Sequence, residues 1–207
     1  MRLKISLLFI VAVMVSAIPA MAKERVYVEV RALETRLPYQ EATDLPHSVT
    51  KHGISLAAHA LNESESINLF AYDLNDDGYL PVKIVLTNTS PLRLLVHGSD
   101  VQLSTAGQTF SPVPAAEIIP TVQDHISIPF FNVSKEEFYN EDAIRKNAVF
   151  VNFNQKGLVY RILEPGQSVS GIAYFNRKDL PEDDLSVSLR VQDLGRIRYL
   201  TLMAKVH

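Results

Sequence analysis

The chain has 207 residues, a formal net charge of −3, no cysteine and no tryptophan. The missing cysteines exclude disulfides, thiol catalysis and Cys-ligated zinc. The slightly acidic balance argues against nucleic acid or an anionic membrane as the main partner.

The first 22 residues have the layout of a cleaved secretory signal peptide. Arg2 and Lys4 precede an apolar run over residues 5–17, and Ala20-Met21-Ala22 supplies a small-residue cleavage site. The alternative is a retained N-terminal anchor helix. Cleavage leaves 18 basic and 23 acidic residues, a net charge of −5. No cysteine follows the cut to carry a lipid. We therefore expect a periplasmic or secreted protein that begins near Lys23.

The mature chain, residues 23–207, shows mostly two-residue periodicity, which is typical of half-buried strands. A proline-containing loop is expected over residues 36–49. The pattern predicts strands at residues 25–31, 53–61, 79–88, 92–96, 99–104, 109–110, 158–163, 168–175, 185–192 and 196–206. Within 79–88, Val82, Ile84 and Leu86 should share one face. Gly171 should mark a bulge or a close approach of another segment.

Short helices interrupt this pattern. Asn62 and Glu65 form a capping box for a helix that runs to about Ala71 and buries Ile67 and Phe70. One helical turn is expected at residues 114–119, stopped by Pro120. A third helix is predicted from 134 to 147. Residues 149–153 then pair with 158–163 as a hairpin, or the helix continues through Val151.

About eight to ten short strands, with turns every 8–12 residues, predict one domain built as a two-sheet antiparallel sandwich. Three stretches also resemble a group of uncharacterised bacterial exported proteins and lipoproteins. They are residues 54–58 (ISLAA), 78–90 (GYLPVKIVLTNTS) and 163–175 (LEPGQSVSGIAYF), and the resemblance covers roughly residues 54–175. It implies that the sandwich is immunoglobulin-like, to which the helix signals above add two or three short helices. It brings no catalytic residues.

The segment Asp73-Leu74-Asn75-Asp76-Asp77-Gly78 is the sharpest local motif. Asp73, Asn75 and Asp77 stand at positions one, three and five of a calcium-loop pattern, with glycine at position six. Position twelve, which should be a bidentate glutamate, is Ile84. The alternative is an acidic turn between a helix and a strand. Calcium is the one cofactor that the sequence suggests.

A second candidate site is the apolar, proline-interrupted stretch from Ile126 to Phe131. Ile126, Ile128, Phe130 and Phe131 could form a partner-binding surface, because exposed apolar patches and open sheet edges attract other chains. The alternative is that the phenylalanines plug one end of the sandwich.

The sequence contains no recognisable enzyme motif. His97-Gly98-Ser99-Asp100 holds three residue types of a catalytic triad, but neighbours in a turn usually diverge. We therefore predict an exported, non-enzymatic β-sandwich that binds another envelope or secreted protein. The alternatives are a Ca²⁺- or small-ligand-binding sandwich that uses the acidic loop 73–78, and a hydrolase without a recognisable motif.

Overall fold

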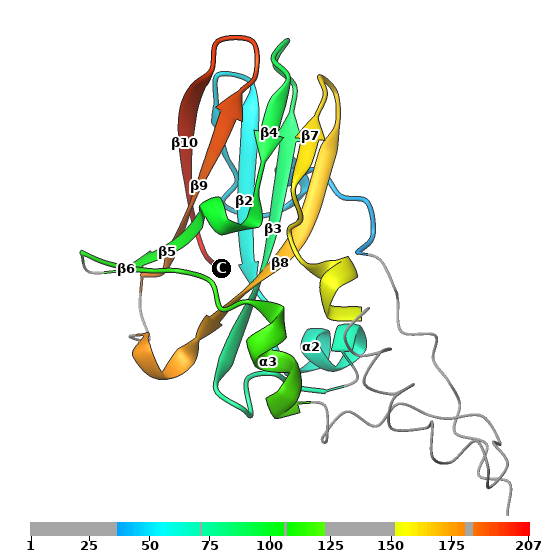
Figure 1. Cartoon of the computed structure of the whole chain (residues 1–207), viewed down its shortest axis with the longest axis vertical. Helices are drawn as coiled ribbons and strands as arrows, with labels where there is room; N and C mark the ends of the chain where they lie inside the picture. Colours follow the sequence, from blue (N-terminus) through cyan, green and yellow to red (C-terminus); the bar gives the residue numbers. More distant parts are fainter. Residues whose placement is uncertain (1–36, 71, 106, 123–151, 181–183) are drawn as a thin grey trace, which may run out of the picture.

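A computed structural model describes residues 37–70, 72–105, 107–122, 152–180 and 184–207. They form a two-sheet antiparallel β-sandwich with few helices (Figure 1). The predicted signal peptide, the strand at 25–31, the stretch Ile126–Phe131 and the helix at 134–147 lie outside the described residues.

The first sheet has four strands in the order β1-β2-β3-β8. These are β1 (Val49–Lys51), β2 (Ile54–Ala60), β3 (Tyr79–Asn88) and β8 (Ser168–Asn176). Strand β3 lies in the centre and pairs with β2 and β8. Pro81 has no backbone N–H and is tolerated because it lies near the start of β3. Its carbonyl accepts from the Leu61 N–H at 2.9 Å.

The second sheet has six strands in the order β6-β5-β9-β4-β7, with β10 on the other side of β9. The strands are β4 (Leu94–Val96), β5 (Val101–Thr105), β6 (Gln108–Phe110), β7 (Arg161–Leu163), β9 (Ser186–Asp193) and β10 (Arg198–Lys205).

Strands β4 and β5 are two parts of one long strand, because both pair antiparallel with the same edge of β9. Leu94 lies opposite Asp193, and Val101 lies opposite Leu189. The chain therefore advances seven residues from β4 to β5 while the paired strand β9 advances only four. The three extra residues form a 3-10 turn, η2 (Gly98–Asp100), that bulges out of the sheet.

The connectivity is that of an immunoglobulin-like sandwich. Strands β2-β3-β8 correspond to A-B-E in one sheet, and β10-β9-β4 to G-F-C in the other. Strand β7 lies beside β4 at the sheet edge. The predicted fold class is confirmed, and the strand alternation in β3 is as expected, with Val82, Ile84 and Leu86 in the core between the sheets.

This main core is aliphatic apart from a few aromatic rings. It also contains Leu94, Val101, Leu103, Val169, Ala173, Phe175, Val187, Leu189 and Val191. On the outer face of the first sheet, Val85 and Ala57 are covered by the loop that contains the 3-10 turn η1 (Ala42–Asp44). The Ala42 N–H donates to Thr87 Oγ1 at 2.8 Å and fixes that cover.

Helix α2 (Glu63–Phe70) begins with the predicted capping box. The Glu65 N–H donates to Asn62 Oδ1, and the Asn62 N–H donates to Glu65 Oε2, both at 3.0 Å. Phe70 is buried as expected, but the prediction for Ile67 is wrong, because its side chain is 44% exposed. Ser66 occupies the buried position instead, where its hydroxyl bridges the Tyr72 carbonyl and the Leu74 N–H.

Two further predictions near the helices are wrong. Helix α3 (Ala115–Val122) runs through Pro120 instead of stopping there, because Ile118, Ile119 and Val122 are buried while Pro120 stays exposed. Residues 152–156 are helical, so the hairpin predicted for 149–153 and 158–163 does not form. The helical segment ends at Lys156. Strand β7 pairs with β4 and not with residues 149–153.

The helices gather at one end of the sandwich, over the outer face of β8 (Figure 1). There Phe70, Phe153 and Tyr174 stack with ring centroids 4.8 to 6.0 Å apart. We call this the aromatic cluster. It also contains Leu61, Leu74, Ile118, Ile119, Val122 and Ile172.

Candidate functional site

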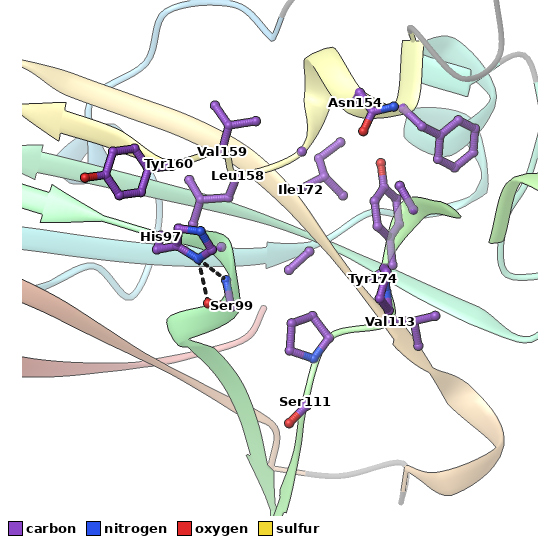
Figure 2. Close-up of a pocket in the computed structure, with 17 residues that line it drawn as sticks. His97, Ser99, Ser111, Val113, Asn154, Leu158, Val159, Tyr160, Ile172 and Tyr174 are labelled. Atoms are coloured by element: carbon purple, nitrogen blue, oxygen red, sulfur yellow. Dashed lines mark hydrogen bonds between the residues drawn. The ribbon is translucent and has the colours of Figure 1, made fainter. Parts of the chain in front are cut away.

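A cavity of about 670 Å³ lies along the edge of β8, near the aromatic cluster. Its lining comes from four places in the chain: residues 97–99 at the η2 bulge, 111–115, residues 153, 154 and 157–160, and 172–174 of β8 (Figure 2). A volume of this size is ordinary for a small-molecule site.

Two segments flank the cavity, and the backbone attaches both of them to β8. On one side the Val113 N–H donates to the Tyr174 carbonyl at 2.7 Å. On the other side Gly157 forms a parallel bridge with Ile172. Backbone contacts with β8 therefore hold both walls of the cavity in place.

Leu158 is fixed between two glycines from opposite sheets. A Cβ added at Gly171 of β8 would lie 2.6 Å from Leu158 N and 2.7 Å from Leu158 Cβ. A Cβ at Gly98 of η2 would collide with the Leu158 carbonyl oxygen. The expected close approach at Gly171 is thus confirmed, and it allows residues 157–160 to form a cavity wall.

Tyr174 is among the residues that line the cavity, but its hydroxyl is buried away from the cavity space. Its side chain is 3% exposed, and its hydroxyl has no hydrogen-bond partner among the described residues. Burial raises the pKa of Tyr174 far above its ordinary value. The hydroxyl therefore stays protonated and can donate as well as accept a hydrogen bond.

His97 and Ser99 form an exposed polar pair at another part of the lining (Figure 2). The Ser99 N–H donates to His97 Nδ1 at 3.1 Å, and Ser99 Oγ lies 2.5 Å from the same nitrogen. Asp100 does not join them, because its Oδ1 pairs with Arg190 at 2.9 Å. The three residues thus do not form a triad, and His97 caps the η2 turn.

The acidic loop 73–78 forms a turn in which two of the predicted ligand residues bind protein groups. Asp73 Oδ1 accepts from the Asn75 backbone and side chain, at 3.0 and 2.7 Å. Asn75 Oδ1 accepts from the Arg177 guanidinium at 2.9 Å. The buried Oδ2 of Asp77 has no hydrogen-bond partner in the described part of the chain.

The acidic loop also affects a neighbouring tyrosine. Burial and a hydrogen bond with the Asp77 side chain, together with the charges of Asp77, Asp76 and Asp73, raise the pKa of Tyr72 to about 12. Throughout residues 37–70, 72–105, 107–122, 152–180 and 184–207, no three His, Asp or Glu side chains cluster as a metal site would require.

An apolar edge adjoins the cavity. Val159, Tyr160 and Ile162 are 46%, 63% and 41% exposed, and they lie in and just before β7. Strand β7 ends the sheet order, and no described strand pairs with it on the side opposite β4. We call Val159, Tyr160 and Ile162 the β7 edge patch. The predicted partner-binding stretch Ile126–Phe131 lies outside the described residues.

The sequence analysis missed both the cavity and the β7 edge patch. Its signals were present but separate: the close approach at Gly171, the polar turn at His97 and an apolar run after Gly157. These segments lie about 60 to 75 residues from His97, and local periodicity does not show that they meet.

No protein-family model matches the chain, and no curated protein matches it. One solved structure that is similar to the chain is the yjhA protein from Bacillus subtilis, at 10% identity and a TM-score of 0.41. The match covers 79% of this chain and 98% of that one. Among the helices in the described residues, none has the length and apolar character needed to cross a membrane.

Proposed function

We propose that this chain is an exported, non-catalytic binding module that holds an extended segment of another envelope or secreted protein. The observation that carries the proposal is the β7 edge patch, an exposed apolar surface on a sheet edge that no described strand pairs with. Free edges offer backbone N–H and C=O groups to an added strand, and alternate side chains give that pairing its specificity.

The composition of the edge supports this role. Sheet edges that must stay unpaired are usually short or carry charged side chains, prolines or bulges. Strand β7 is short and begins with the exposed Arg161, but it places Ile162 outward and continues the apolar surface of Val159 and Tyr160. An extended apolar segment of a partner could pair with β7 and cover Tyr160 and Ile162 together.

Export of the chain is part of the proposal. It is supported by the layout of residues 1–22, with a basic start, an apolar run and a small-residue cleavage site. The test is the mass of the protein in the extracytoplasmic fraction. A mature chain beginning near Lys23 supports export, and a full-length chain retained in the cytoplasm contradicts it.

Binding at the edge is tested by photocrosslinking in the organism that makes the protein. A benzophenone amino acid replaces Tyr160 in one variant and Tyr199, which is 54% exposed on β10, in the matched control. We expect a discrete adduct with a second protein from position 160 and none from position 199. Ile162→Asp should abolish the adduct without lowering the Tm, because Ile162 is exposed.

Two results contradict the proposal. Equal adducts from positions 160 and 199 would mean that crosslinking reports general exposure. An adduct with the mass of two copies of the chain would assign the edge to self-association.

A further inference from the structure

We propose that residues 25–31 of this chain pair as an antiparallel strand with β7 and cover the β7 edge patch until a partner displaces them. The inference deepens the proposed function, on which it rests for the partner, because it says how the same binding edge is regulated. A strand that the chain itself supplies competes with the partner's extended segment for the same backbone N–H and C=O groups of β7.

The first argument is the exposed apolar character of the edge. Tyr160 just before β7 and Ile162 within it are 63% and 41% exposed, and no described strand pairs with β7 on this side. An open apolar edge pairs with other chains, so natural proteins cover or blunt it. A cover that belongs to the chain itself protects the edge at every protein concentration.

The second argument is the pattern of residues 25–31 (RVYVEVR). Valine alternates there with charged or aromatic residues at a period of two, which is typical of a strand with one apolar face. The three valines are the residues that an apolar edge would cover, and the charged side chains would keep the new outer edge soluble.

The third argument is that an antiparallel register matches both strands. In this register the cross-strand pairs are Val30 with Tyr160, Glu29 with Arg161, and Val28 with Ile162. The two valines would lie beside the two exposed apolar side chains, and the glutamate beside the exposed guanidinium. Apolar pairs and opposite charges directly across two strands are both stabilising.

The side of the register that faces the main core is also consistent. Tyr27 would lie opposite Leu163, which belongs to the main core, and would extend that core at its edge. A parallel strand with the same Glu29–Arg161 pair would instead set Arg31 against Leu163. Burying a charge beside an apolar core is unfavourable, so the antiparallel direction is preferred.

The start of the described chain lies within reach of β7. Leu37 packs against the aromatic cluster, which includes Phe153, and Phe153 lines the same cavity as Val159. Strand β7 runs away from this end of the sandwich (Figure 1), so an antiparallel strand returns toward it and sets Arg31 opposite Val159. Six steps along the chain join Arg31 to Leu37 and span up to about 20 Å.

The test is a disulfide between two engineered cysteines in the full chain, which has no native cysteine. Val28→Cys with Ile162→Cys places the thiols on opposite residues of the proposed pair, within the Cα separation of about 4.4 to 6.8 Å that a disulfide needs. The matched control is Val28→Cys with Met203→Cys, because Met203 is 55% exposed on β10 and the strands β4 and β9 separate β10 from β7.

We expect the first pair of cysteines to oxidise within one chain at least roughly tenfold faster than the control pair, because strand pairing raises their effective concentration. The mass of the intact protein and the loss of free thiols measure this. Bridging within one chain separates the proposal from pairing between two copies, which would double the mass.

The effect on the partner is measured with the photocrosslink at position 160. Val28→Asp sets a charge against Ile162 and should release the strand, so we expect about two- to tenfold more adduct with the second protein. Thr35→Asp adds the same charge between residues 31 and 37, outside the proposed strand, and should leave the adduct yield unchanged.

The proposal is overturned if the two cysteine pairs oxidise at the same rate, or if the disulfide joins two chains. An adduct at position 160 that Val28→Asp does not increase also overturns it. Failure of the proposed function gives a different result: no adduct forms with a second protein even in Val28→Asp, while fast oxidation within one chain still supports pairing of residues 25–31 with β7.

Discussion

The two faces of β8 are built in different ways. Its inner face presents Val169, Ala173 and Phe175 to the main core, where the two sheets interlock. Its outer face presents Ile172 and Tyr174 to the aromatic cluster, which is assembled from helices far apart in the chain. The inner face forms part of a closely packed interior, whereas the outer face adjoins a cavity and includes a hydroxyl that has no partner among the described residues. Sheet packing fixes the fold, and the added segments enclose the cavity.

The largest expected effect comes from the main core. Ile84→Ala, at a fully buried position of β3, should lower the free energy of unfolding by about 2 to 5 kcal/mol. Ile67→Ala makes the same chemical change at the exposed position on α2 and should change it by about 0.5 kcal/mol or less. Urea unfolding measures both. Similar losses would mean that α2 buries Ile67 after all.

The next effect concerns Gly171, where β8 touches the cavity wall at Leu158. Gly171→Ala forces a methyl group into Leu158 and should cost about 1 to 3 kcal/mol, or more if the wall cannot shift. Gly166→Ala is the control, because its Cβ meets nothing within 4 Å and the cost is only that of its positive φ of 81°. That cost is about 1 kcal/mol. If Gly171→Ala is the milder change in thermal unfolding, Leu158 is not clamped.

On helix α2, the buried Ser66 hydroxyl has two hydrogen-bond partners, which an ordinary surface helix would not provide. Ser66→Ala leaves the Leu74 N–H and the Tyr72 carbonyl without their bridge, so we expect a loss of about 1 to 3 kcal/mol. Ser64→Ala, at an exposed position of the same helix, should be neutral or slightly stabilising because alanine favours helix. Equal Tm values for the two variants would contradict a structural role for Ser66.

The inner face of β8 and the rest of the sandwich could be predicted because their signals are local. Alternation placed Val82, Ile84 and Leu86 in the core, and the turn at residues 164–167 joined β7 to β8. The capping box at Asn62 and Glu65 needs only four neighbouring residues. Each of these features follows from sequence periods or turn chemistry that the chain displays within a dozen residues.

The outer face could not be predicted, because tertiary packing outweighs local preference there. Pro120 is a strong stop signal, yet burial of Ile118, Ile119 and Val122 carries α3 past it. Residues 152 and 153 look like part of a strand, but Phe153 is drawn into a helix by Phe70 and Tyr174. The cavity combines four segments that are far apart in the chain, and nothing local in the sequence shows that they meet.

A smaller effect tests the start of α2, which links β2 to the aromatic cluster. Burial raises the pKa of Glu65, but hydrogen bonds from the Asn62 N–H and His59 outweigh it, so the pKa falls below 4.5. Glu65 therefore stabilises the fold above that pH, and this contribution is lost as pH falls through the folded-state pKa. Asn62→Ala should cost about 1 kcal/mol near pH 7.

The pH dependence is checked by urea unfolding at about pH 7 and about pH 3. Wild type should lose more stability between the two than Glu65→Gln, which has no carboxylate to protonate. His59 lies 2.9 Å from Glu65 Oε2, so His59→Gln is a second check on the same pair. An equal loss in wild type and Glu65→Gln would place the acid sensitivity elsewhere.

The smallest expected effect is that of calcium on the acidic turn. Asp73 binds Asn75, and Asn75 binds the positively charged Arg177, so the three predicted ligands do not present a shared set of free oxygens. We expect no rise in Tm when EDTA is replaced by millimolar Ca²⁺. A site saturated 100-fold above its Kd would add about 2.7 kcal/mol. A rise of that order, lost in Asp77→Ala but kept in Asp44→Ala, would show that the turn opens and Arg177 gives up Asn75.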